Sequence, residues 1–201
     1  MNLAIAAAFA LAGGTGGFLI HRTIERKEPR RSSLERNTTI GASSIVPALL
    51  YLKYQGSGEV AVVYGMLALV LIGTSVFDLR KQVIPHVVTL PGIAAGLAAS
   101  TWILPVGFRS SVIGMLLGAG ILLFTTFVEA ARHKEIGGGD WKLAAAIGSF
   151  LGANRLVAGM LFAGLFGMIV GVLLIWRRAA TKPAALGPYI SAGAIAAMLW
   201  K

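Results

Sequence analysis

The sequence predicts an all-α fold, a polytopic membrane bundle of about eight transmembrane helices that form one membrane-embedded domain, 1–201. Apolar residues make up 56% of the 201 residues and charged residues only 13%, unlike the composition of soluble globular proteins. Apolar stretches also recur along the whole chain, and basic residues gather between them. Because a membrane-spanning helix needs about 20 apolar residues, eight spans would leave only about 40 positions for loops. The composition therefore excludes a separate soluble enzyme domain.

The first stretch, 3–20, is expected to remain as a helix rather than be removed as a signal peptide. No positive residue precedes it, and a basic cytoplasmic loop at 21–39 follows. Two other stretches, 40–52 and 143–153, are too short to cross a hydrocarbon core of about 30 Å at 1.5 Å per residue. They could extend into flanking residues, thin the bilayer or re-enter. The eight stretches are 3–20, 40–52, 60–77, 83–104, 111–128, 143–153, 156–176 and 184–200.

The basic residues predict the orientation, with the N-terminus outside. In that orientation only four of the 18 Lys and Arg residues lie outside, as the positive-inside rule requires. If 40–52 did not cross, the charges at 78–81 would move outside, so 40–52 is kept as a span. The net charge of +10 is explained in the same way, and no nucleic-acid partner is expected. The four outside residues are Lys53, Arg109, Arg155 and Lys201.

Helix contacts are expected where glycines recur four residues apart, because a residue without a side chain lets two backbones approach closely. We interpret these glycines as packing positions and give them no chemical role. The pairs are Gly92/Gly96, Gly114/Gly118, Gly148/Gly152 and Gly167/Gly171.

The candidate chemistry rests on two aspartates, Asp78 and Asp140, the only ones in the sequence. Both lie at the cytoplasmic ends of predicted spans. Asp78 ends the third stretch, where a helix C-terminus disfavours a carboxylate, and Asp140 opens the sixth. Taken singly, Asp78 could pair with Arg80 and Asp140 could serve as an ordinary helix N-cap. As a pair at membrane depth they indicate a functional site.

Two carboxylates in one site of low dielectric cannot easily both ionise, so one would hold a shared proton. That arrangement suits peptide hydrolysis, since the ionised group takes a proton from water while the protonated group polarises the carbonyl. Gly137, Gly138 and Gly139 precede Asp140 and would let an extended substrate backbone approach, or they are only a flexible connector. Glu135 is a weaker candidate, for binding a basic substrate residue.

No cofactor or metal is expected. The sequence has no Cys, which removes disulfides, thiol nucleophiles and cysteine-ligated zinc. His21, His86 and His133 all map to the cytoplasmic rim, so a metal site is conceivable there, but no HExxH pattern occurs.

Two motifs surround the aspartates: Phe77-Asp78 followed by Val83-Ile84-Pro85, and Gly137-Gly138-Gly139-Asp140. They resemble the motifs of the type IV prepilin peptidases, aspartic membrane proteases of the GxGD type. The resemblance runs from 76 to 152, with a further similarity at 187–189 before the last stretch. It implies that Asp78 and Asp140 are catalytic. It also implies cleavage of the short positive leader of prepilins or pseudopilins, the substrates of type IV pilus and type II secretion systems. The reaction would take place at the cytoplasmic face of the inner membrane.

Many members of that family also carry a cysteine zinc insert after the first span and N-methylate the new pilin terminus. The 21–39 loop has no Cys, so we expect peptidase activity alone, as in the shorter members. His86 stands where the family commonly has an acidic or amide residue. Two other hypotheses stay open: a small transporter or channel that uses the aspartates as proton or cation sites, and an inactive assembly partner of a secretion machine. The oligomeric state is not predicted.

Overall fold

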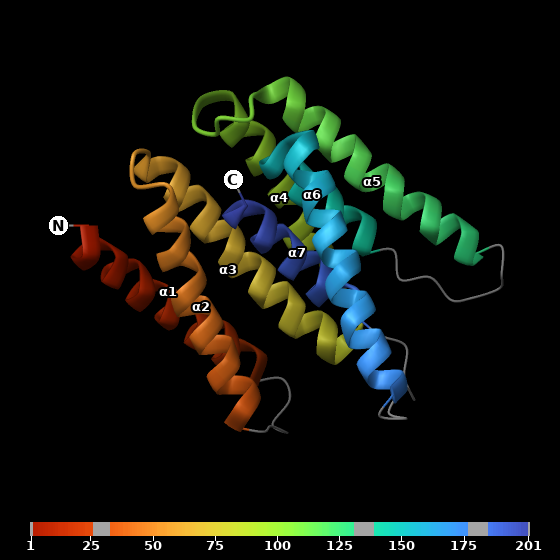
Figure 1. Ribbon diagram of the computed structural model, residues 1–201, viewed down its shortest axis with the longest axis horizontal. Coiled ribbons are helices and arrows are strands. Elements are labelled where there is room, and N and C mark those ends of the chain that lie inside the picture. Colours follow the sequence, from red (N-terminus) through yellow and green to blue (C-terminus); the bar gives the residue numbers. More distant parts are fainter. Residues whose placement is uncertain (1, 26–32, 131–138, 177–184, 201) are drawn as a thin grey trace. The chain divides into compact units, whose positions relative to one another are not determined.

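The computed structural model describes residues 2–25, 33–130, 139–176 and 185–200, and within these ranges it is an all-α fold of seven helices (Figure 1). The backbone of an apolar segment must satisfy its own hydrogen bonds inside a bilayer, and a helix does this within one segment. The helices are α1 Asn2–Glu25, α2 Ser33–Lys53, α3 Gly58–Lys81, α4 His86–Trp102, α5 Phe108–Ala130, α6 Asp140–Trp176 and α7 Gly187–Leu199.

Three helices are long and apolar enough to cross a membrane, namely α3, α5 from Phe108 to Val128, and α6. Two further apolar helices, Ile5–Phe18 and Gly187–Leu199, are shorter. The multi-pass membrane protein expected from the sequence is thus supported, but the expected number of eight helices is wrong for the described residues. The stretches 143–153 and 156–176 belong to a single element, α6.

The chain divides after Phe77 into two compact units, residues 1–77 and 78–201. In the first unit α1 packs closely on α2, because Gly13 and Gly17 of α1 lie against the backbone and side chain of Ser43. The rings of Phe9 and Tyr51 stack with their centroids 4.8 Å apart. The short stretch 40–52 is lengthened at its start by flanking residues, so that α2 has 21 residues and a length of about 31 Å.

The predicted loop at 21–39 is shorter than expected. Helix α1 continues to Glu25 and α2 already begins at Ser33. Polar residues at the ends of membrane helices extend beyond the hydrocarbon core, where helical hydrogen bonding remains as favourable as in water, so hydropathy alone places the ends too early.

In the second unit the first part of α6 is surrounded by protein, and every residue from Leu143 to Gly152 is buried. Glycines make this possible, as the sequence predicted. Gly96 of α4 faces Ser149, while Gly114 and Gly118 of α5 lie against the backbone at Gly148 and Ala144. The pairs Gly92/Gly96, Gly114/Gly118 and Gly148/Gly152 are therefore confirmed as packing positions. Gly171 is not, because no described atom lies within 4 Å of a Cβ built there.

Helix α6 is broken at Gly152, whose φ of 71° and ψ of 176° are not helical. The break frees the backbone N–H of Ala153, which donates to Ser110 Oγ at 3.3 Å. We call 140–151 the first arm and 153–176 the second arm. The first arm is only about 18 Å long, so on its own it is too short to cross the core.

The two arms run in opposite directions (Figure 1). The first arm begins beside Ile84, close to the end of α3, and leads away from it to Gly152. The second arm passes Gly193 of α7 at Gly159 and Tyr189 at Gly167, so it approaches the start of α7 again. The stretches 143–153 and 156–176 are thus separate helical segments, and Gly152 rather than a loop joins them.

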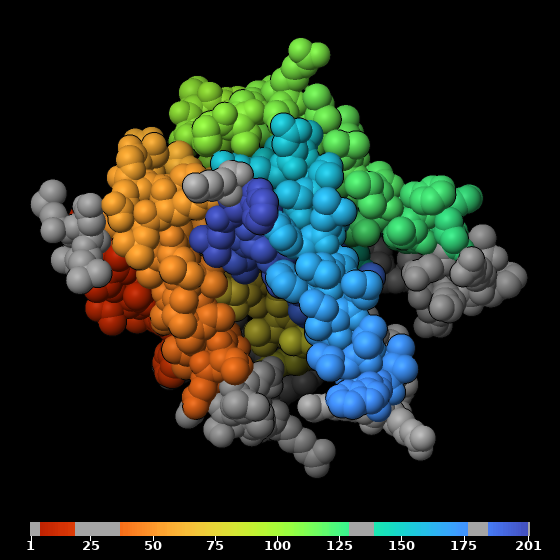
Figure 2. All heavy atoms as spheres, viewed as in Figure 1, coloured from red at the N-terminus to blue at the C-terminus, as the bar shows by residue number. Residues whose placement is uncertain are grey.

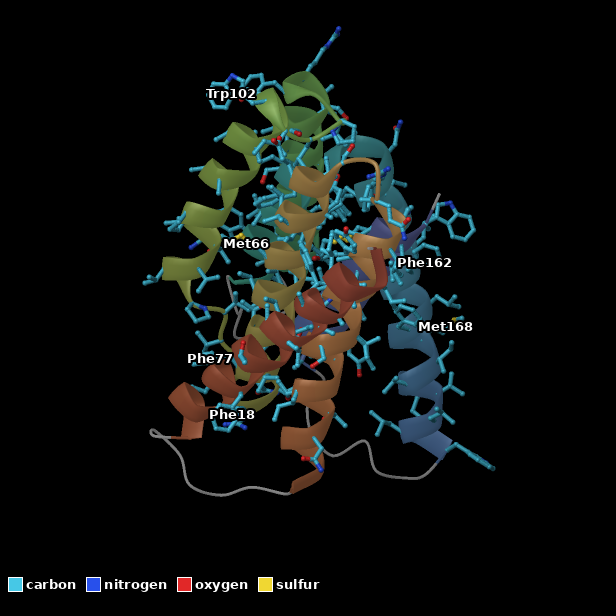
Figure 3. The ribbon with its side chains drawn as sticks, turned by 90° about the vertical axis from the view of Figure 1, so that its left-hand side faces the viewer. Phe18, Met66, Phe77, Trp102, Phe162 and Met168 are labelled. Atoms are coloured by element: carbon cyan, nitrogen blue, oxygen red, sulfur yellow. The ribbon has the colours of Figure 1, made fainter. Side chains whose placement is uncertain are left out.

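The second arm packs on α7 with one side and exposes apolar side chains on the other. Figure 2 shows α7, in dark blue, directly against the light-blue second arm. Phe162 and Trp200 meet with ring centroids 5.4 Å apart, whereas Met168 is 61% exposed and lies on the outer side of the arm in Figure 3. An exposed apolar side of this kind is suited to lipid.

Candidate active site

Asp78 lies in the last turn of α3, and its side chain is only 5% exposed. Its Oδ2 accepts a hydrogen bond of 2.9 Å from the backbone N–H of Gly187, the first residue of α7. The C-terminal end of α3 carries partial negative charge and disfavours the Asp78 carboxylate. The N-terminal end of α7 carries partial positive charge and offsets this, so two helix ends of opposite sign meet at one carboxylate.

The chain turns sharply just after Asp78. Gln82 has a φ of 51°, the left-handed conformation that commonly ends helices, and its N–H donates to the Asp78 carbonyl at 2.8 Å. Ile84 is then buried, and Pro85 precedes α4 with an extended backbone, φ −65° and ψ 127°. The end of α3 and the start of α4 therefore form one side of the site, with Asp78 next to the turn.

The start of α6 packs against this turn. A Cβ built on Gly139 would lie 2.8 Å from Ile84 Cβ and 3.2 Å from Ile84 N, so only glycine fits there. The sequence interpretation gave Gly139 the role of admitting a substrate backbone. In the structure, Gly139 lies against Ile84 of the same chain.

Asp140 follows Gly139 and is half-buried in the first turn of α6. The alternative that Asp140 is the N-cap is wrong by one position, because the carbonyl of Gly139 accepts the hydrogen bond of 3.1 Å from the Leu143 N–H. A carboxylate in the first turn is favoured by the helix dipole. Both aspartates thus lie at the end of the second unit where α4, α6 and α7 begin.

The rim of the site is basic and aromatic. Lys142 Nζ lies 3.3 Å from His86 Nδ1, which connects the first turns of α4 and α6, and 5.1 Å from the centre of the Trp141 ring. His86 is therefore on the rim of the site. In the described part of the chain, no three His, Asp or Glu side chains gather in a way that would hold a metal ion.

Glu135, Gly137, Gly138 and His133 lie outside the described residues, and His21 belongs to α1 in the other unit. Sequence reasoning did not assign Gly187 to the site. Its signals are a Gly-Pro pair that opens an apolar stretch and the family resemblance at 187–189, and neither says which side chain the amide will reach.

Comparison with known proteins identifies the family of the chain. The profile of the Type IV leader peptidase family matches residues 65–172, which is more than half of the chain and includes both aspartates. The chain belongs to this family. The matched range contains the end of α3 with Asp78, the turn before α4 with Ile84, and the start of α6 with Asp140.

Curated relatives carry the name prepilin leader peptidase/N-methyltransferase. The chain is 32% identical to the protein of Burkholderia pseudomallei strain K96243 over 148 residues, which are 72% of this chain and 48% of that one. It is 35% identical to the Bacillus subtilis protein over 135 residues, 65% of this chain and 52% of that one. The chain thus spans about half the length of the curated relatives it matches. No solved structure matches it significantly.

Proposed function

We propose that the chain is a membrane aspartic endopeptidase that removes the leader peptide of type IV prepilins or pseudopilins. The observation that carries the proposal is the placement of Asp78. It is a buried carboxylate at the meeting point of helix ends, inside the range that matches the leader peptidase family, and its turn packs against the segment that leads into Asp140.

The chemistry needs one proton between the two carboxylates. The ionised aspartate takes a proton from a water molecule as the oxygen attacks the carbonyl carbon of the scissile amide. The protonated aspartate donates a hydrogen bond to the carbonyl oxygen, where negative charge develops. The amide C–N bond then breaks, and the leaving nitrogen takes up the proton that came from water. No covalent intermediate and no cofactor are required.

The substrate class follows from the membrane setting. A prepilin carries a short positive leader followed by an apolar helix, so its cleavage site would lie at the membrane surface. Both aspartates lie at helix ends rather than in the middle of a span, which suits a bond at that depth. We expect peptidase activity without N-methylation, since the sequence contains no cysteine for a zinc insert.

We place the site at the cytoplasmic face of the inner membrane on the basis of charge. Arg80 and Lys81 close α3 beside Asp78, and Lys142 follows Asp140. Basic residues next to spans favour the cytoplasmic side. This side also contains the leader of an unprocessed prepilin.

The cleavage test uses the full chain in detergent or lipid vesicles with a synthetic prepilin peptide, analysed by mass spectrometry. Wild type should cut one bond at the leader junction, and Asp78→Asn or Asp140→Asn should each abolish the cut while the helical circular dichroism is retained. Glu59→Gln is the matched control, because it removes an exposed carboxylate at the opposite end of α3. Full cleavage by either Asn variant would remove that aspartate from the mechanism.

The orientation is tested by labelling, which the absence of native Cys makes simple. Val83→Cys lies in the exposed turn after α3, and Gly56→Cys lies in the exposed connection before it. In intact cells a membrane-impermeant maleimide should label Gly56→Cys and spare Val83→Cys until the membrane is opened. The reverse pattern would place the site on the outer face.

A further inference from the structure

The amide of Gly187 is the group that the structure brings to the Asp78 carboxylate from 109 positions further along the chain. Both the Asp78 side chain and Gly187 are buried, so water does not compete strongly for the 2.9 Å hydrogen bond between them. A hydrogen bond to one oxygen restrains the rotation of the whole carboxyl group, since the two oxygens are fixed in one plane. The direction of Oδ1 is thus set by the contact at Oδ2.

The position accepts no side chain. A Cβ built on Gly187 would lie 2.6 Å from Asp78 Oδ2, 3.0 Å from Cγ and 3.1 Å from Cβ. Ordinary van der Waals contact begins at 3.4 Å, so the carboxylate oxygen would have to retreat by 3.4 − 2.6 = 0.8 Å. Glycine is required at position 187 for space, because the backbone there lies directly against the Asp78 carboxyl group.

The amide is itself held in place. Pro188 stands in the first turn of α7, where its fixed φ suits a helix start, and the N–H of Ile190 donates to the Leu186 carbonyl at 3.1 Å. Further along α7, a Cβ on Gly193 would clash with the carbonyl of Gly159 in the second arm of α6. The start of α7 is therefore braced against α6, and its amide cannot easily follow a displaced side chain.

We infer that Gly187 is a positioning residue for catalysis, whose backbone N–H aims the Asp78 carboxylate at the reacting water. The inference rests on the proposed function. A backbone amide suits this task because it cannot ionise and has no side-chain rotamers, and the positive end of α7 adds a favourable field at the same oxygen. In the absence of this contact, Asp78 would remain buried but its oxygens would not be directed.

The first test compares three Gly→Ala variants of the full chain in detergent with a prepilin peptide as substrate. Gly187→Ala should lower kcat by about 100-fold, because a displacement near 1 Å of a catalytic group costs that much, and should leave KM unchanged. Gly107→Ala should lower the thermal stability, because its φ of 72° disfavours a residue with a side chain, but keep the kcat of the folded protein. Gly164→Ala should change neither, since no described atom lies within 4 Å of its Cβ.

A double-mutant cycle that combines Gly187→Ala with Asp78→Ala tests the contact itself. It measures stability and does not require activity. The stability lost on Gly187→Ala should be smaller in the Asp78→Ala background, where the displaced carboxylate is absent. An equal loss in both backgrounds, or an unchanged kcat in Gly187→Ala, would overturn the inference. If wild type cleaves no prepilin peptide, the proposed function fails. An equal stability loss in both backgrounds would then separately refute the contact between Gly187 and Asp78.

Discussion

Replacing Gly152 by alanine should destabilise the chain more than any ordinary helical Gly→Ala change, because Gly152 connects the two arms of α6. Its φ of 71° and ψ of 176° lie in a region that residues with a side chain essentially do not adopt. A non-glycine residue held there costs on the order of 1–3 kcal/mol. The free energy of unfolding should fall by at least that amount.

The surroundings of Gly152 add a steric cost. Its Cβ would lie 2.6 Å from Ser110 Oγ and 3.2 Å from Val106 Cβ. Ser110 Oγ also accepts the hydrogen bond from the Ala153 N–H, so moving it away leaves that amide without its partner. Overpacking adds about 1–3 kcal/mol, which gives a total of about 2–6 kcal/mol.

Two further glycines separate the backbone cost from the steric cost. Gly107 has a φ of 72° but no described atom within 4 Å of its Cβ. Gly107→Ala should therefore lower the free energy of unfolding only by the cost of the left-handed backbone, about 1–2 kcal/mol. Gly171 is helical and has open space, so Gly171→Ala should be neutral or slightly stabilising. The expected order of destabilisation is Gly152→Ala, then Gly107→Ala, then Gly171→Ala.

The assay is SDS titration of each variant in mixed micelles, followed by circular dichroism and tryptophan fluorescence. Gly152→Ala should unfold at the lowest SDS fraction. If it unfolds together with Gly171→Ala, the chain does not make the left-handed break at 152, and the description of α6 as two opposed arms is wrong.

Two further predictions concern the packing and the polar interior of the second unit. Gly148→Ala should lower the free energy of unfolding by about 1–3 kcal/mol in the same titration, because its Cβ would meet the backbone carbonyl of Gly114, which cannot move aside; stability equal to wild type would contradict that contact. Ser191→Ala should keep or raise stability, by about 1 kcal/mol, because the buried Ser191 hydroxyl has no hydrogen-bond partner among the described residues; a clear loss would show that the hydroxyl has a partner after all.

The helix ends that lie around the two aspartates also have an electrostatic role. Three helices, α4, α6 and α7, begin at the end of the unit that contains Asp78 and Asp140. Each helix start carries partial positive charge and unpaired amides. Such an end tolerates two carboxylates close to the membrane better than an end made of helix C-termini would.

The sequence by itself determined the membrane class, the places of the apolar helices along the chain and the two aspartates as the candidate site. These properties are local: hydropathy sets where a helix can lie, and the residue type alone says which side chains are carboxyl groups. The same holds for Gly96, Gly114 and Gly148, since glycines four residues apart form one helix face whatever packs on it. For the same reason the ends of the 21–39 loop were misplaced, because polar helical turns have no hydropathy signal.

Only the tertiary structure decided that Gly152 joins two opposed arms and that Gly187 reaches Asp78. A positive φ at Gly152 is stable because Ser110, from another helix, pairs with the amide that the break exposes. The Gly187 amide meets Asp78 because α7 is braced on α6, which returns the chain to the end of α3. Contacts between residues so distant in sequence depend on how helices pack, and no local pattern of residues encodes them.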